Sequence, residues 1–253
     1  VASFLEGHGI LFLYRVHPQP DQEKLDALFK LLATTELGAK LPKEKDPKSL
    51  QILLKEAKDT DLEFLVNRLL LRSMMQAKYS PINEGHFGLA STNYCHFTSP
   101  IRRYADLVVH RALKKVLSAQ IPARQKPKKL KKLGESLSVL ERKAMEAERE
   151  ILKRATILSL RTRIGESFTG VISGLTDFGF WVELEDVLAD GLVRLSSLTD
   201  DYYTFWPEQQ KIIGRRTGKT FSLGQKIEVI LQNASLDRLE LELIVLNFRS
   251  SES

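Results

Sequence analysis

The sequence has very little cysteine and no long apolar run. Cys95 is the only cysteine among 253 residues, so no disulfide can form within the chain, and a cytoplasmic setting is expected. No stretch approaches the roughly 20 apolar residues that a membrane-spanning helix requires, and no signal peptide is recognisable. We therefore expect no membrane partner. With 43% hydrophobic and 28% charged residues, the composition is that of a globular protein.

Acidic residues are scarce in one long segment of the chain. Residues 111–163 contain sixteen Lys and Arg against five Glu, an excess of eleven positive charges. The remaining 22 basic and 27 acidic residues sum to −5, which gives the total of +6. Such a concentration of charge fits a polyanion as the partner. Individual lysines of the loop at 122–132 could equally belong to a solvated connector.

One stretch, residues 94–111, combines helix-capping residues with a proline, and its sequence is YCHFTSPIRRYADLVVHR. Thr98 or Ser99 can accept hydrogen bonds from the first amides of a helix. Pro100 suits the first helical position, because its missing N–H would have no partner there. The pattern therefore predicts a helix from Pro100 to Leu117.

Two arginines, Arg102 and Arg103, would lie in the first turn of that helix. A helix start favours anions, and planar guanidinium groups bind phosphate well, so the pattern predicts a phosphate clamp. Cations at this end work against the helix dipole, which favours a binding role. The alternative is an ordinary surface ion pair between Arg102 and Asp106. The predicted buried side of the helix consists of Ile101, Ala105, Val108 and Ala112.

The same run closely resembles the hallmark of the RNase II/RNase R family of processive 3′→5′ exoribonucleases, in the C-terminal half of their catalytic RNB domain. Two upstream segments, LFLYRVHPQPDQEKL at 11–25 and GHFGLA at 85–90, resemble that family in the same order. Downstream, residues 165–246 resemble an S1 RNA-binding domain. The segment DDYYTFWPEQQKIIGRRTGKTFSLG at 200–224 is similar to the RNase R subtype.

The resemblance and the apolar periodicity together predict an α+β fold. Periodicity changes from helical to alternating near Arg163. Residues 1–163 would form the mainly helical C-terminal part of an RNB catalytic domain. Residues 164–247 would form a five-stranded S1 barrel of the OB type, and 248–253 a tail. The expected strands are 168–174, 177–184, 191–196, 226–231 and 238–243.

No segment fits the aspartate cluster D-x5-D-x-D-D that binds catalytic metal in the resembling family. The aspartates at 59 and 61, or at 200 and 201, have no further carboxylates at that spacing. We therefore expect no metal site in this chain, and expect Mg²⁺ to be bound elsewhere in a longer enzyme. Residues 1–5 are consistent with such a longer enzyme, because they begin without Met inside an apolar helical pattern. The N-terminal remainder of such an enzyme could be a partner.

The resemblance also implies how single-stranded RNA, the expected partner, is bound. Arg102 would contact the scissile phosphate with support from Arg103, and these two are the predicted catalytic residues. Arg15 and His17, in the segment RVH, would line the RNA channel. For this second pair the alternative is structural, with Arg15 bound to a carboxylate and His17 capping the next helix.

Aromatic and imidazole side chains accumulate just before the predicted clamp. His86, Tyr94 and His96 lie in a segment without helical period, and they could line a path for stacked bases. Among these, Tyr94 and His96 are predicted RNA contacts. A glutamate of the long helix expected at 130–160 could contact ribose, although surface ion pairs are an equally available role. The sequence does not decide among Glu141, Glu146 and Glu148.

In the S1-like part, Phe178 and Trp181 match the two aromatic positions that S1 domains use for base stacking. Arg194 stands where many S1 domains have His, and it still offers phosphate contact and stacking. Phe180 should point into the barrel, because successive side chains of a strand alternate between faces. An aromatic insertion should close the barrel instead of binding RNA, and it comprises Tyr202, Tyr203, Phe205 and Trp206.

Two functions of other classes compete with the enzyme hypothesis. The chain could be a non-catalytic RNA-binding module, an interpretation that the missing aspartates favour. It could also be a protein-interaction module that uses its S1-like part for partners. Steep salt dependence of RNA binding would discard the second alternative, because contacts to phosphates release counterions.

Overall fold

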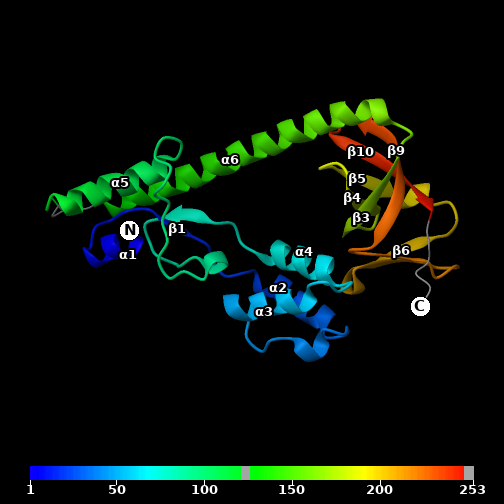
Figure 1. Ribbon diagram of the computed structural model, residues 1–253, viewed down its shortest axis with the longest axis horizontal. Helices are drawn as coiled ribbons and strands as arrows, with labels where there is room; N and C mark the ends of the chain where they lie inside the picture. The colour runs from blue at the N-terminus through cyan, green and yellow to red at the C-terminus, as the bar shows by residue number, and fades with distance from the viewer. Residues whose placement is uncertain (121–125, 248–253) are drawn as a thin grey trace. The chain divides into compact units, whose positions relative to one another are not determined.

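The computed structural model describes residues 1–120 and 126–247 and divides into two compact units (Figure 1). The first unit contains residues 1–25, 42–53 and 72–146, and the second contains 26–41, 54–71 and the chain from 147 onward. The tail expected at 248–253 and part of the basic loop lie outside the described residues. Within them, no helix is long and apolar enough to cross a membrane.

Helices dominate the chain up to residue 160, and a barrel follows, so the α+β prediction is confirmed. Short 3-10 turns lie at 38–40, 87–89, 161–163, 195–197 and 207–209. The expected long helix is present as one uninterrupted element. The helices are α1 (Ala2–Gly7), α2 (Gln22–Leu32), α3 (Pro47–Ala57), α4 (Glu63–Ser73), α5 (Tyr104–Leu117) and α6 (Pro127–Leu160).

The predicted helix start at Pro100 is wrong, because α5 begins at Tyr104. The amides of Arg102 and Arg103 both donate to the carbonyl of Ser99, at 3.3 and 3.0 Å, so these residues form a turn. The carboxylate of Asp106 reaches back and accepts the Ser99 amide at 2.7 Å, which holds this turn in front of the helix.

The later start rotates the buried side of α5 away from the expected one. Ile101 lies in the turn and is completely exposed, so its predicted place in the core is wrong. Asp106, which the alternative of a surface ion pair would leave at the surface, is completely buried. The side chains that α5 buries are Ala105, Asp106, Val109, Ala112 and Val116.

A two-stranded antiparallel sheet joins β1 (Tyr14–Val16) to β2 (Lys78–Ser80), and α6 packs closely on it. A Cβ atom on Gly134 would lie 2.7 Å from the carbonyl oxygen of Tyr79, so only glycine permits this approach. One turn later, the hydroxyl of Ser138 accepts the Tyr79 amide at 2.9 Å. Around this contact Leu13, Tyr79 and Ala105 form a core, against which Leu130, Leu133 and Leu137 pack.

In the second unit five strands close into a barrel in the order β10-β5-β4-β3-β9 (Figure 1), which confirms the five-stranded prediction. These strands are β3 (Ser167–Leu175), β4 (Gly179–Leu184), β5 (Asp190–Arg194), β9 (Lys226–Ser235) and β10 (Glu240–Asn247). Phe180 is fully buried, as the alternation of side chains predicts. Other buried side chains of the barrel include Phe168, Ile172, Val182, Val193, Val229 and Leu231.

The aromatic insertion between β5 and β9 forms a sheet of its own, which the sequence did not predict. It consists of β6 (Tyr203–Trp206), β7 (Lys211–Gly214) and β8 (Thr220–Ser222), paired antiparallel. The buried ring of Phe221 stacks on Phe180 with centroids 4.7 Å apart, so this sheet contributes to the barrel core. Tyr202 is 83% exposed and adds nothing to that closure.

We expect Gly134→Ala to destabilise the chain although alanine is the better helix former. The new methyl group would overlap the Tyr79 carbonyl, and overpacking of this kind costs about 1–3 kcal/mol, more than the gain in helix propensity. The matched control is Gly7→Ala in α1, where nothing lies within 4 Å of the added atom. Urea denaturation of both variants measures the difference. Equal stability of the two would contradict the close approach of α6 to β2.

Candidate nucleic-acid interface

A continuous row of imidazole and phenol rings, which we call the ring row, lies in the first unit. Its members in order are His17, His86, Tyr94, His96 and Tyr79. The rings of His17 and His86 are stacked with their centroids 5.1 Å apart, and those of His86 and Tyr94 lie edge to face at the same distance. The following contacts are edge to face at 5.8 and 5.6 Å. Three of the predicted RNA contacts are therefore brought together with His86, which the sequence placed on the possible base-stacking path, and with Tyr79, which was not predicted.

Backbone hydrogen bonds of β1 hold the row in place. The amide of Arg15 donates to the carbonyl of Tyr94 at 2.9 Å, and the amide of His17 donates to the carbonyl of Gly85 at 3.0 Å. Between them, Val16 is fully buried. Alternation along the strand therefore turns Arg15 and His17 to the side opposite this core residue. The His17 ring accepts the Gly88 amide at 3.2 Å, instead of capping α2.

Arg15 ends the row in a pair with a glutamate of α6. Its guanidinium contacts the carboxylate of Glu141 at 2.6 Å and lies 4.7 Å from the ring centroid of Tyr79, its cross-strand neighbour. The hydroxyl of Tyr79 lies 3.0 Å from His96 Nδ1. Of the three glutamates that the sequence left open, Glu141 is thus the one at the site. The other two, Glu146 and Glu148, are exposed.

Burial favours the uncharged form of the three histidines of the row and of Tyr79. Burial, together with nearby Arg15, lowers the pKa of His17 and of His86. For His96, burial first and then the charges of Arg103 and Arg15 lower the pKa to about 4. Burial and the charge of Glu141 raise the pKa of Tyr79 to about 12. The histidines and Tyr94 are half-buried and can offer ring surface to bases, whereas Tyr79 is buried and supports them from the core. Stacking of this kind tolerates any sequence.

The two predicted catalytic arginines differ in their surroundings. Arg103 donates to the fully buried carboxylate of Asp106 at 2.9 Å. Burial opposes ionisation of Asp106, but hydrogen bonds from Arg103 and the Ser99 amide outweigh it and lower its pKa. Arg102 is exposed and has no ion-pair partner among the described residues. The alternative pairing of Arg102 with Asp106 is therefore wrong, and Arg102 is the guanidinium available to a ligand.

In the barrel, β4 and β5 place Trp181 and Arg194 on the same outer surface. Trp181 lies opposite Leu192, and Gly179 lies opposite Arg194. The pair between them, Phe180 and Val193, points inward. Phe178 precedes β4 and is 52% exposed. Trp181 and Phe178 therefore both present ring surface to solvent, as base stacking requires.

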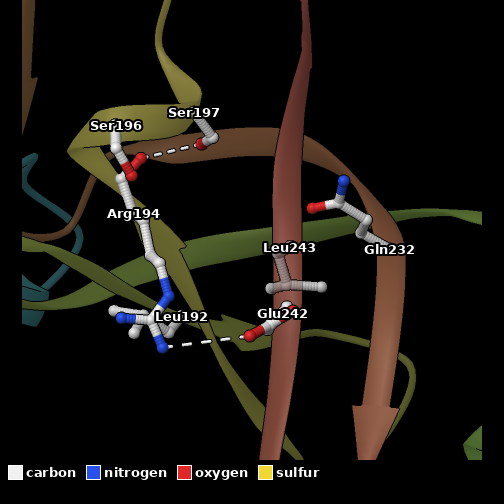
Figure 2. Close-up of a pocket in the computed structure, with 7 residues that line it drawn as sticks. All are labelled: Leu192, Arg194, Ser196, Ser197, Gln232, Glu242 and Leu243. Atoms are coloured by element: carbon white, nitrogen blue, oxygen red, sulfur yellow. Dashed lines mark hydrogen bonds and ion pairs between the residues drawn. The ribbon is translucent and has the colours of Figure 1, made fainter.

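A shallow pocket of about 250 Å³ lies beside Arg194 on this surface (Figure 2). The Arg194 guanidinium reaches toward β10, where it lies 3.2 Å from Glu240 and 3.9 Å from Glu242. These carboxylates offset its charge, so stacking suits this arginine better than contact with phosphate. The residues that line the pocket are Leu192, Arg194, Ser196, Ser197, Gln232, Glu242 and Leu243.

A metal site does not form from the described residues. Across 1–120 and 126–247, three or more His, Cys, Asp or Glu side chains nowhere gather so that they could hold an ion. The residues present therefore do not fit a catalytic metal, and no step through one is derived. Cys95 is half-buried beside the ring row, and burial raises the pKa of its thiol.

The low pKa of His96 predicts a loss of stability on mild acidification. Since His96 has a pKa of about 4 when folded and 6.5 ordinarily, the unfolded chain takes up the proton first as the pH falls. This residue should cost on the order of 2–3 kcal/mol between roughly pH 6.5 and pH 4. His96→Gln should flatten the profile of unfolding free energy over that window, and the control is His8→Gln, at the exposed position just after α1. Parallel profiles for all three chains would refute this assignment.

Comparison with known proteins places these features in a family. Two family models match, the RNB domain at residues 1–119 and the S1 RNA binding domain at 161–243. Ribonuclease R of Aquifex aeolicus is 45% identical over 247 residues, which make up 96% of this chain and 35% of that protein. Ribonuclease R 1 of Lactococcus lactis is 40% identical over 249 residues, 96% of this chain and 30% of that protein. The chain spans about a third of the length of these relatives.

Solved structures agree with the sequence matches. The apo form of Mycoplasma genitalium RNase R is similar with a TM-score of 0.85 at 31% identity, covering 97% of this chain and 39% of that one. The structure of that enzyme in complex with ribose methylated single-stranded RNA gives the same TM-score and coverage at 32% identity. This chain, with its RNB portion, S1 barrel and ring row, belongs to the RNase II/RNase R family as an RNase R-like member.

Proposed function

We propose that this chain is the C-terminal, RNA-binding part of an RNase R-like enzyme. The enzyme would hydrolyse single-stranded RNA processively from the 3′ end and release 5′-monophosphates. The ring row carries the proposal, because a line of rings whose end at His96 and Tyr79 lies near Arg15 and Arg103 suits a strand of stacked bases and phosphates. The family match and the RNA complex of the Mycoplasma enzyme support it.

Each residue of the site would have a distinct part in holding RNA. Arg102, exposed and unpaired, would contact the scissile phosphate, and its fixed positive charge would stabilise charge gathering there. Arg103 would act as a positioning residue, since its bond to Asp106 holds the turn that presents Arg102. Glu141, oriented by Arg15, would accept a hydrogen bond from a ribose hydroxyl.

We propose Mg²⁺ as the metal of the whole enzyme, with ligands supplied by residues outside this chain. The support is the family, whose catalytic metal binds an aspartate cluster that this sequence lacks. When bound, the ion would supply activated water. A cytoplasmic setting remains our proposal, on the strength of the single cysteine.

A non-catalytic RNA-binding module is the second candidate, and the missing aspartate cluster favours it. Both candidates use the same surfaces, namely the ring row and the outer face of β4 and β5. The finding that separates them is the cluster itself, which belongs N-terminal to these elements in the resembling enzymes. Its presence in the same gene product would decide for the enzyme.

We expect the chain alone to bind RNA without shortening it. The test uses 5′-labelled single-stranded RNA with Mg²⁺, and a binding titration at two salt concentrations. Affinity should fall steeply with salt, because phosphate contacts release counterions, while the RNA keeps its length. Processive shortening from the 3′ end would contradict our placement of the metal ligands. A salt-independent affinity would favour the protein-interaction alternative.

Replacement of Trp181 by alanine should weaken binding of single-stranded RNA by about tenfold to a hundredfold. One stacked base contributes on the order of 1–3 kcal/mol, and Trp181 is the larger ring on the outer face of β4. Trp206→Ala is the matched control, because Trp206 is 51% exposed on the separate β6 sheet and was not predicted to bind RNA. A fluorescence anisotropy titration compares the two. Equal losses would argue against the β4 face as the RNA site.

A further inference from the structure

Eight exposed cations gather where α5 ends and α6 begins, and we call this surface the basic end. Helix α5 and the part of α6 up to residue 146 belong to the first unit (Figure 1). No acidic residue occurs anywhere between positions 111 and 132. No carboxylate pairs with any of the eight among the described residues. They are Arg111, Lys114, Lys115, Lys126, Lys128, Lys129, Lys131 and Lys132.

Packing explains why these side chains face solvent. The helix α5 buries its small and β-branched residues, and α6 turns Leu130, Leu133 and Leu137 toward the core around Tyr79. The lysines are left on the outer side of each helix. The helix α1 packs against α5, but its acidic residue, Glu6, is already hydrogen-bonded to Tyr14. Neighbouring elements therefore provide no compensating charge that the structure records.

Helix energetics account for only part of the basic end. At the C-terminus of α5, Lys114 and Lys115 complement the helix dipole, which is an ordinary stabilising role. The first two turns of α6 are different, because cations at a helix N-terminus oppose the dipole, and no acidic residue occurs in the first turn. Lys128 and Lys132 are also like charges four residues apart, which repel each other. Glu135 is the one acidic residue within a turn of Lys131 and Lys132, and no ion pair with it is present among the described residues.

We propose that the basic end is a binding site for the sugar–phosphate backbone of RNA, formed by residues separate from the ring row and the barrel face. The proposal rests on the proposed function, since RNA is the polyanion that those other surfaces suit. Phosphates neutralise the lysines that the helix places unfavourably, and each contact releases counterions. Such a surface captures RNA of any sequence and raises its local concentration.

The test removes four charges from α6 without disturbing its helix. The variant is K128Q/K129Q/K131Q/K132Q, because glutamine forms helices about as well as lysine. The control is K30Q/K43Q/K48Q/K58Q, which removes the same charge from exposed lysines of the other segments. Each control lysine has an acidic residue within four positions in the sequence, whereas Lys128 and Lys129 have none. The probe is a labelled single-stranded RNA of roughly 30 nucleotides, titrated from about 50 to about 200 mM salt.

We expect the negative slope of log affinity against log salt to become shallower by about 2–3 in the α6 variant, or by roughly 0.7 for each lost phosphate contact. Affinity at the lowest salt should fall on the order of tenfold or more, and the control should change little. The thermal midpoint of the variant should equal or exceed that of the parent, since repulsion is relieved. The smaller variant K131Q/K132Q should show about half of the change in slope.

Distinct outcomes overturn the inference and the proposed function. Equal slopes for the α6 variant and the control, with RNA still bound, would overturn the basic end alone. Absence of RNA binding by the parent chain would overturn the proposed function as well. Binding to phosphatidylserine vesicles that only the α6 variant loses, with RNA affinity unchanged, would assign the surface to a lipid headgroup instead.

Discussion

The buried carboxylate of Asp106 is the interaction on which the candidate site depends. It accepts hydrogen bonds from the Ser99 amide and the Arg103 guanidinium, and it has no contact with solvent. A buried charge without partners would be very costly, so the turn before α5 and the orientation of Arg103 are fixed together. The same arrangement leaves the neighbouring arginine, Arg102, in solvent. The buried ion pair of Arg103 with Asp106 therefore gives the two arginines different surroundings, because Arg103 is held in place and Arg102 remains available to a ligand.

The close contact between α6 and β2 is the second constraint. Three α6 residues at helical spacing face the same strand, and each has a different role. Gly134 allows the approach, Ser138 binds the Tyr79 amide, and Glu141 reaches Arg15 and the end of the ring row. The helix that supports the core thus also delivers a carboxylate to the site. Its opposite side remains free for the exposed lysines of its first turns.

Under the proposed function, the chain would combine two physically different means of holding a nucleic acid. The ring row offers uncharged aromatic and imidazole surfaces, because burial lowers the pKa values of its histidines. The basic end offers uncompensated charge at the solvent surface. On the barrel, Arg194 is intermediate, since two glutamates offset its charge. Stacking and phosphate contact are thereby largely assigned to different residues.

Periodicity and motifs in the sequence were sufficient for the fold class, the five barrel strands and the inward Phe180. These features follow from local spacing, which backbone geometry translates directly into faces and elements. The start of α5 was not predictable, because Thr98, Ser99 and Pro100 suit a helix start and only the distant carboxylate of Asp106 overrides them. The sheet β6-β7-β8 was likewise not predicted, since the sequence indicated only an aromatic insertion that closes the barrel.

Tertiary structure alone decided which residues complete the site. Tyr79 and Glu141 are 62 positions apart and carry no shared motif, yet they meet because Gly134 lets α6 lie against β2. The choice among three similar glutamates depended on that single contact. Sequence spacing determined what each segment can do locally, and packing between distant segments determined which side chains act together.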